Sequence, residues 1–167
     1  SVEAFFLPSL SLLAKIPPTA MLAVFFVLAG TEMPMFIAII AFGVFPSLAQ
    51  SIYLSIRDIP DELLNKSYTL GASYPEIILH VVLPSILPKL IDAIRLQIGP
   101  AMVYLIAAEM VAADVGFGFR IRLQSRLINM DVVYIYLTLL AIFGYFVDYM
   151  LRLFQGFICP WYSEKKD

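Results

Sequence analysis

The chain has 167 residues, of which 61% are hydrophobic and only 14% are charged. Soluble globular domains are typically about 45–50% apolar and about 25% charged, so this composition excludes a water-soluble domain and indicates a membrane protein. The formal net charge of −2 excludes nucleic-acid binding, which needs a basic surface. The single cysteine, Cys159, excludes an internal disulfide, and the one histidine excludes a Cys/His metal site.

Four apolar stretches are the predicted membrane spans, and the first two precede residue 57. The first runs from about residue 16 to 30 and reaches spanning length only with the apolar residues 4–13 before it. Pro17-Pro18 predicts a kink in that span. The second runs from about residue 34 to 56 and carries only uncharged residues, so it is expected to cross the membrane.

The segment after the second stretch is charged and polar, and it predicts two short helices. Asp58 is the expected N-cap of the first helix. Gly71 is expected to end it, because glycine adopts the left-handed conformation without a Cβ penalty. Ser73 and Glu76 have the capping-box spacing that opens the second helix. Residues 58–80 therefore form a structured elbow between two spans.

The third and fourth stretches run from about residue 84 to 113 and from about 132 to 158, with a polar connection between them. With four spans, the start of the chain, the elbow and the tail lie on the same side of the membrane. That side holds the basic residues Lys15, Arg57, Lys66, Lys89, Arg152, Lys165 and Lys166, and the other side holds Arg120, Arg122 and Arg126. The positive-inside rule therefore predicts a cytoplasmic elbow.

The elbow carries a specific spacing. Gly71 is followed, after nine residues, by Val81-Val82-Leu83-Pro84, and Asn65-Lys66-Ser67 ends three residues before it. This pattern resembles the cytoplasmic signature of binding-protein-dependent ABC importer permeases: Glu-Ala-Ala, three residues, Gly, nine residues, Ile-x-Leu-Pro. Gly71, Val81, Leu83 and Pro84 match it in register.

The resemblance extends over nearly the whole chain and is closest to the nitrate/sulfonate/taurine-type permeases. The further matching segments are Ile16-Pro17-Pro18, Phe45-Pro46, Leu70-Gly71-Ala72-Ser73, Leu83-Pro84-Ser85-Ile86-Leu87-Pro88, Ala108-Glu109-Met110, Gly116-Phe117-Gly118 and Gly144 with Asp148. Family members usually have about six spans, and this chain resembles them from the third onward. The sequence is therefore expected to be N-terminally truncated relative to the family.

One departure concerns the Glu-Ala-Ala triplet, which is Asn65-Lys66-Ser67 here. In the family this segment forms a coupling helix that sits in a groove of the ATPase subunit. The acidic residue is replaced by an amide, and Glu62, one turn earlier, is its expected partial substitute. Leu63, Leu64 and Leu70 are expected to form the apolar face of this helix, with Tyr68 and Tyr74 as docking groups.

The resemblance implies an all-α, polytopic helical bundle forming one partial permease domain over residues 1–167, with the coupling loop at 58–80. It implies a transporter subunit of the bacterial inner membrane, not an enzyme, with no cofactor of its own. The implied partners are cytoplasmic subunits that bind ATP, an external solute-binding protein, a second permease copy and membrane lipid. The implied solute is small and polar or anionic, such as nitrate, a sulfonate, taurine or a urea-like compound. The implied coupling residues are Glu62, Asn65, Lys66, Ser67, Gly71, Val81, Leu83 and Pro84.

Charged residues inside the predicted spans are functional candidates, because burying a charge in a bilayer is costly. Glu109 is a candidate for the translocation pathway; it lies fourteen residues after Arg95, about 21 Å along one helix, too far for a direct pair. Arg95 is expected to snorkel or to pair with Asp92. Asp148 needs a hydrogen-bonding partner or a wet cavity.

Two alternatives stay open on the sequence: a small integral membrane enzyme or scaffold, and a nonfunctional permease remnant. An intramembrane enzyme is expected to cluster acids or histidines on adjacent helices, whereas the charges here are scattered. Gly116-Phe117-Gly118 lacks the flanking strand of a nucleotide-binding loop, and the sequence has no Gly-Lys-Ser/Thr phosphate loop. Energy for transport would therefore come from another chain.

Overall fold

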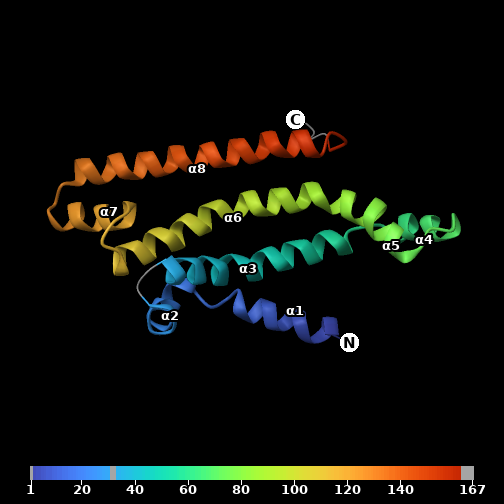
Figure 1. The fold of residues 1–167 in the computed structure, drawn as a ribbon, viewed down its shortest axis with the longest axis horizontal. Helices are drawn as coiled ribbons and strands as arrows, with labels where there is room; N and C mark the ends of the chain where they lie inside the picture. The colour runs from blue at the N-terminus through green and yellow to red at the C-terminus, as the bar shows by residue number, and fades with distance from the viewer. Residues whose placement is uncertain (1, 31–32, 163–167) are drawn as a thin grey trace.

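The structure is a computed structural model that describes residues 2–30 and 33–162. Every regular element in those two ranges is a helix, which confirms the all-α prediction (Figure 1). In chain order the elements are α1 (Val2–Leu13), η1 (Pro18–Met21), α2 (Leu22–Ala29), α3 (Met33–Arg57), α4 (Asp61–Thr69), α5 (Tyr74–Ile77), η2 (Ile78–Val82), α6 (Leu83–Ala112), α7 (Phe117–Arg126) and α8 (Met130–Ile158). Glu32, Lys165 and Lys166 lie outside the described residues.

Three helical segments are long and apolar enough to cross a membrane: α3, the continuous segment Tyr74–Ala112 that contains α5, η2 and α6, and α8. The shortest, α3, has 25 residues and is about 37 Å long, more than the roughly 30 Å of a bilayer's hydrocarbon core. The second, third and fourth expected spans are therefore continuous helices. Their observed bounds lie within about two residues of the predicted ones.

The first expected span differs from the prediction, because it is not one helix. α1 ends at Leu13, and the next apolar helical segment, Pro18–Ala29, is too short to count among the membrane-spanning helices of the described chain. Pro17 has φ −64° and ψ 120°, the extended conformation that a residue before proline favours. The Pro17-Pro18 pair therefore interrupts the helix instead of kinking it.

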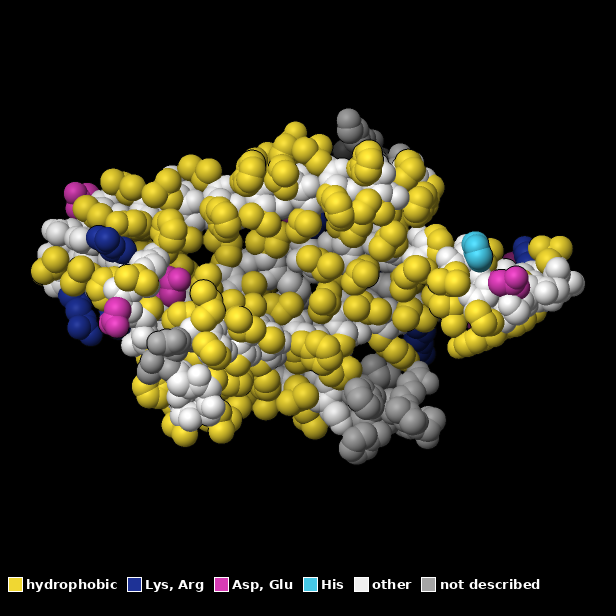
Figure 2. Space-filling model, in the orientation of Figure 1, with side chains coloured by type: hydrophobic (Ala, Val, Ile, Leu, Met, Phe, Trp, Pro, Cys, Tyr) yellow, Lys and Arg dark blue, Asp and Glu magenta, His cyan; other side chains and the backbone are white. Residues whose placement is uncertain are grey.

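Successive long helices run in opposite directions, so segments that are far apart in the sequence share the same end of the molecule (Figure 1). The N-terminus, α4 and the C-terminal end of α8 lie towards one end, while α2 and α7 lie towards the other. Figure 2 shows hydrophobic side chains over the middle of this face and charged side chains gathered at the two ends. The start of α1, the elbow and the C-terminal end of α8 therefore lie at the same end of the molecule, which agrees with the predicted arrangement.

The tightest packing joins α3 to α6. Met35 and Ile39 of α3 and Ala108 of α6 are fully buried and form one apolar cluster. Gly43 of α3 allows a close approach, because a Cβ atom there would overlap the Tyr104 ring of α6 and come within 2.9 Å of the Pro18 ring. The interrupted first stretch thus packs on α3 through a position that has no side chain.

We expect Gly43→Ala to destabilise the protein by about 1–3 kcal/mol, because the added methyl group overpacks the α3–α6 contact. The melting temperature of the purified protein in detergent measures this effect. Gly99→Ala is the matched control, since a Cβ at Gly99 of α6 meets nothing within 4 Å. Equal melting temperatures for the two variants would contradict the packing described for Gly43.

Candidate functional site

The first candidate site is α4, which extends away from the membrane-spanning helices (Figure 1). The helix follows Pro60, whose extended backbone (φ −62°, ψ 130°) occupies the N-cap position without a side-chain hydrogen bond. The predicted Asp58 cap is therefore wrong, because Asp58 lies two residues before that position. Its carboxylate instead pairs with the Lys89 ammonium group of α6 at 3.1 Å. This ion pair joins the start of the elbow to the start of the next span.

The end of α4 is a Schellman motif, which confirms that Gly71 terminates the helix. Gly71 has φ +85°, a left-handed conformation that glycine adopts most readily. Its N–H donates to the Tyr68 carbonyl at 2.9 Å, and the Ala72 N–H donates to the Ser67 carbonyl at 3.1 Å. These bonds satisfy carbonyls at the helix end and fix the direction in which the chain leaves α4.

α4 and the residues that follow it present apolar side chains outside the membrane-spanning bundle. Leu70 is 88% exposed, and Leu63, Tyr68 and Tyr74 are also exposed, whereas Leu64 is half-buried. A partner protein would remove these exposed groups from water, and burial of apolar area is the main favourable term in most protein association. The arrangement is chemically suited to docking.

The polar residues of the signature lie on the same helix. Asn65 and Lys66 are exposed, and the Lys66 ammonium lies 3.8 Å from the Glu62 carboxylate, one turn earlier. Ser67 is half-buried, and its hydroxyl donates to the Leu63 carbonyl at 2.9 Å. Such an exposed ion pair contributes little to stability, so Glu62 and Lys66 are available to a partner.

The junction between α4 and α6 contains a helical irregularity. Ser73 and Glu76 form the predicted capping box, with the Ser73 N–H donating to the Glu76 carboxylate at 2.8 Å. Next comes η2, a π-helical turn in which the Leu83 N–H donates to the carbonyl of Ile78, five residues earlier. Pro84 follows and has no N–H to donate. Single π-turns within helices are frequently found at functional sites.

Signature residues from α4 and from this junction come together in space. Ser67 and Val81 line the same hollow of about 280 Å³, together with Leu70, Ala72, Glu76, Ile77 and His80. Leu83 and Pro84 begin the α6 span. All eight predicted coupling residues thus lie on α4 or between the Schellman motif and the first turn of α6.

Glu109 lies far from the elbow, near the other end of α6. Its carboxylate accepts the Gly118 N–H at 2.7 Å, and Gly116 has φ +113°, a backbone conformation that L side chains rarely adopt. Arg122 of α7 donates to the Met110 carbonyl at 2.6 Å and so binds one of the last carbonyls of α6. These contacts hold α7 against α6 within the expected polar connection, and a pathway role for Glu109 stays a prediction.

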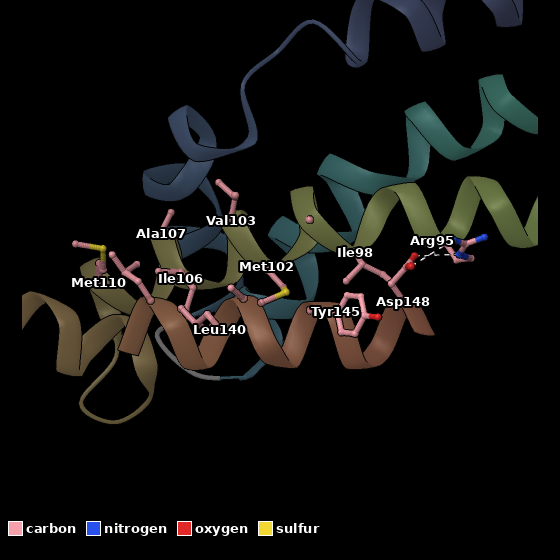
Figure 3. Close-up of a pocket in the computed structure, with 14 residues that line it drawn as sticks. Arg95, Ile98, Met102, Val103, Ile106, Ala107, Met110, Leu140, Tyr145 and Asp148 are labelled. Carbon is pink, nitrogen blue, oxygen red and sulfur yellow. Dashed lines mark hydrogen bonds and ion pairs between the residues drawn. The ribbon is translucent and has the colours of Figure 1, made fainter. Parts of the chain in front are cut away.

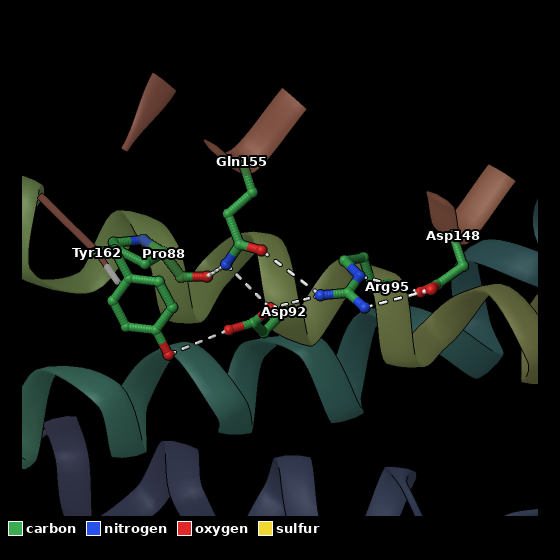
Figure 4. Close-up of polar contacts among 6 residues, drawn as sticks. All are labelled: Pro88, Asp92, Arg95, Asp148, Gln155 and Tyr162. Carbon is green, nitrogen blue, oxygen red and sulfur yellow. Dashed lines mark hydrogen bonds and ion pairs between the residues drawn. The ribbon is translucent and has the colours of Figure 1, made fainter. Parts of the chain in front are cut away.

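A second polar site joins α6 to α8 (Figure 4). The Arg95 side chain is only 11% exposed, and its Nε donates to Asp148 Oδ1 at 2.9 Å while its Nη2 donates to Asp148 Oδ2 at 3.2 Å. Its Nη1 donates to Asp92 at 3.0 Å, which confirms the predicted pair. The pairing of Arg95 with Asp148 was not predicted, because the two residues lie 53 positions apart in the sequence. The presence of two opposite charges in separate predicted spans was the one feature of the sequence that could have suggested it.

Beyond Arg95, α6 and α8 line an open groove of about 720 Å³ (Figure 3). Arg95 and Asp148 are its two charged lining residues and lie together at one end. The remaining lining residues are Ile98, Gly99, Met102, Val103, Ile106, Ala107, Met110, Leu137, Leu140, Ala141, Gly144 and Tyr145. The contact between the two spans is therefore polar near the elbow and apolar along the groove.

Cys159 follows the last residue of α8 and is fully buried. Burial raises the pKa of its thiol, and the nearby charge of Asp92 raises that pKa further. The thiol is therefore protonated at neutral pH and is not an activated nucleophile.

We expect Arg95→Met to destabilise the protein by about 2–3 kcal/mol, because it leaves the Asp92 and Asp148 carboxylates between two spans without their cation. Adding Asp148→Asn should recover part of the loss. Melting temperatures in detergent measure both effects, with Arg120→Met on the exposed surface of α7 as the control. Additive losses in the double variant would contradict the ion pair.

Comparison with known proteins identifies the family. The family described as binding-protein-dependent transport system inner membrane component matches residues 1–158 of this chain. This match includes the elbow, the α6–α8 contact and all three long helices, and it ends with the last residue of α8.

Several curated relatives are similar over most of the chain. The taurine transport system permease protein of Escherichia coli K12 is 27% identical over 157 residues, which is 94% of this chain and 57% of the relative. A Methanocaldococcus jannaschii protein named as an ABC transporter permease is 30% identical, with 94% and 59% covered. A Bacillus subtilis protein named for aliphatic sulfonates transport is 26% identical, with 95% and 58% covered. The chain thus spans less than two thirds of the length of these relatives.

The relatives are named as transport permeases, so the enzyme alternative is not supported. Together with the three membrane-spanning helices, the family match makes this a multi-pass inner-membrane protein. The chain belongs to the family of inner-membrane components of binding-protein-dependent transport systems.

Proposed function

We propose that this chain is the permease part of an ATP-driven ABC importer and that α4 is the helix on which an ATP-binding subunit docks. The observation that carries the proposal is the position and surface of α4. It extends beyond the ends of the spans and presents Leu63, Tyr68 and Leu70 to solvent. An amphipathic helix that places such side chains in a groove is a recurring mode of protein recognition.

The connection from α4 to the membrane supports a role in transmitting movement. The Schellman motif at Gly71 fixes one end of α4, and the Asp58–Lys89 ion pair ties the chain before α4 to α6. The capping box at Ser73 then leads without a break into the α6 span. A displacement of α4 by a partner would therefore reach α6 through a short, hydrogen-bonded path.

The proposed docking surface on α4 also carries an acidic group. Asn65 occupies the position at which the family signature has glutamate, so the acidic group of the surface would be Glu62. Its carboxylate is exposed and only loosely paired with Lys66, at 3.8 Å. In the proposal, Glu62 meets a cation of the ATP-binding subunit, and this contact adds to the apolar contacts of Leu63 and Leu70.

The other components of the importer are proposed from the family and from the names of the relatives. An external binding protein would deliver the solute, and two permease copies would line the pathway. The partner would bind ATP, because this sequence has no phosphate-binding loop. The names of the taurine and sulfonate relatives support a small sulfonate as the solute.

We expect Leu70→Asp in the intact protein to abolish co-purification of an ATP-binding subunit, because a charge would have to be desolvated in an apolar contact. Leu127→Asp is the matched control, since Leu127 is also exposed but lies at the opposite end of the molecule, after α7. Deletion of residues 61–72 is a more severe version of the same test. Unchanged co-purification with this deletion would contradict docking on α4.

The solute is tested separately by reconstituting the complete importer in liposomes with its binding protein. We expect taurine or another small sulfonate to stimulate ATP hydrolysis and to accumulate inside the vesicles. Stimulation by nitrate or riboflavin, with none by sulfonates, would reject the sulfonate assignment and leave the docking proposal intact.

A further inference from the structure

The first turns of α6 contain two prolines, and each removes a backbone hydrogen bond. A helical N–H donates to the carbonyl four residues earlier, so Pro88 leaves the Pro84 carbonyl without its helical donor. Pro84, which follows the π-turn η2 after Leu83, likewise has no N–H to donate. Missing bonds of this kind are the usual cause of helix kinks, so this junction is a point at which the elbow–α6 segment can bend.

The C-terminal end of α8 supplies side-chain donors to this junction. The Trp161 indole N–H donates to the Pro84 carbonyl at 3.3 Å, where Pro88 provides no N–H. The Gln155 amide donates to the Pro88 carbonyl at 3.0 Å and to Asp92 Oδ1 at 2.9 Å (Figure 4). Gln155 is only 7% exposed, so its bonds lie inside the contact between the helices, whereas Trp161 is 58% exposed.

A turn after α8 brings Trp161 into place. The Cys159 N–H donates to the Gln155 carbonyl at 2.8 Å, and the Tyr162 N–H donates to the Cys159 carbonyl at 2.9 Å. The chain thereby bends back at Cys159, whose side chain is fully buried. Trp161 also lines a hollow of about 440 Å³ together with Leu63 of α4 and Val81 of η2. The end of α8 is thus adjacent to both ends of the elbow.

We propose that Gln155 and Trp161 form a latch that makes the start of α6 and the end of α8 move together when a partner displaces α4. The inference rests on the proposed function and adds two positioning residues to it. Without the latch, the junction at Pro84 and Pro88 would bend and absorb part of the displacement. With it, the same displacement reaches two spans.

The other contacts between α6 and α8 also differ between the end of the two helices near the elbow and the end far from it. Arg95 extends the polar link by binding Asp148, and its Nη1 lies 3.5 Å from the Gln155 amide oxygen. Farther from the elbow the two helices line the open apolar groove to which Gly144 and Met102 contribute. The hydrogen-bonded part of the contact therefore lies at the end that receives the movement.

The experiment uses the complete importer in liposomes and measures solute taken up per ATP hydrolysed. Trp161→Phe keeps an aromatic ring but removes the N–H donor, and Gln155→Met keeps the size but removes the hydrogen bonds to Pro88, Asp92 and Arg95. We expect each variant to retain its ATP-binding subunit and to lower the ratio about threefold to tenfold, the effect of one lost hydrogen bond on an equilibrium. Thr138→Val, which removes a local bond within α8, is the control.

The reactivity of Cys159 reports the latch directly, provided that any cysteine outside these 167 residues is replaced by serine. The buried thiol should react slowly with a maleimide in the unmodified sequence and several-fold faster in Trp161→Phe and Gln155→Met. Thr138→Val should leave the rate unchanged. This measurement requires neither ATP nor solute.

An unchanged ratio of solute to ATP in both latch variants would overturn the inference, as would an unchanged rate of Cys159 labelling. Loss of the ATP-binding subunit from both variants would also overturn it, because the residues would then belong to the docking surface. Failure of the proposed function is distinguishable, since no ATP-binding subunit would then co-purify with the unmodified protein. Two variants of different chemistry keep the test valid if one of them does not fold.

Discussion

Every backbone carbonyl that a proline leaves unpaired inside a bilayer needs a donor from elsewhere, because the hydrocarbon core offers none. This constraint shapes the chain at two places. At Pro17-Pro18 the helix stops, and the segment continues as the short helices η1 and α2. At Pro88 the helix continues, and Trp161 donates to the Pro84 carbonyl from the turn that follows α8. A proline alone does not decide between these outcomes, because α3 and α6 also continue past Pro46 and Pro100.

Charges between the spans obey the same requirement for partners. Arg95 lies between α6 and α8 with Asp92 and Asp148 as its acceptors, and Gln155 bridges to Asp92 on the elbow side. A lone guanidinium at this depth would be costly. The polar network thus stabilises the contact between α6 and α8. It also restricts the hydrogen bonds between these helices to the end near the elbow, since the facing side chains beyond Arg95 and Asp148 are apolar.

The sequence predicted features that depend on neighbouring residues and missed those that depend on distant ones. The long helices follow from local length and hydropathy, and the end of α4 follows from Gly71 alone. The N-cap of α4 was wrong because Pro60 made the preceding backbone extended and Lys89 competed for Asp58. The Gln155–Asp92 bond joins residues 63 positions apart, and one glutamine in an apolar helix gave no signal of its partner.

The elbow signature contains positions that determine the backbone conformation and positions that present exposed side chains. Gly71 and Pro84 act through the backbone: the first needs φ +85°, and the second begins a span without an N–H. Asn65 and Lys66 act only through exposed side chains on α4 and have no such requirement. A change at these two positions therefore leaves the geometry of the elbow intact and alters only what a partner meets. If α4 docks an ATP-binding subunit as proposed, the replacements at Asn65 and Lys66 change the side chains that this subunit meets, while Gly71 and Pro84 keep the backbone of the elbow as the family signature has it.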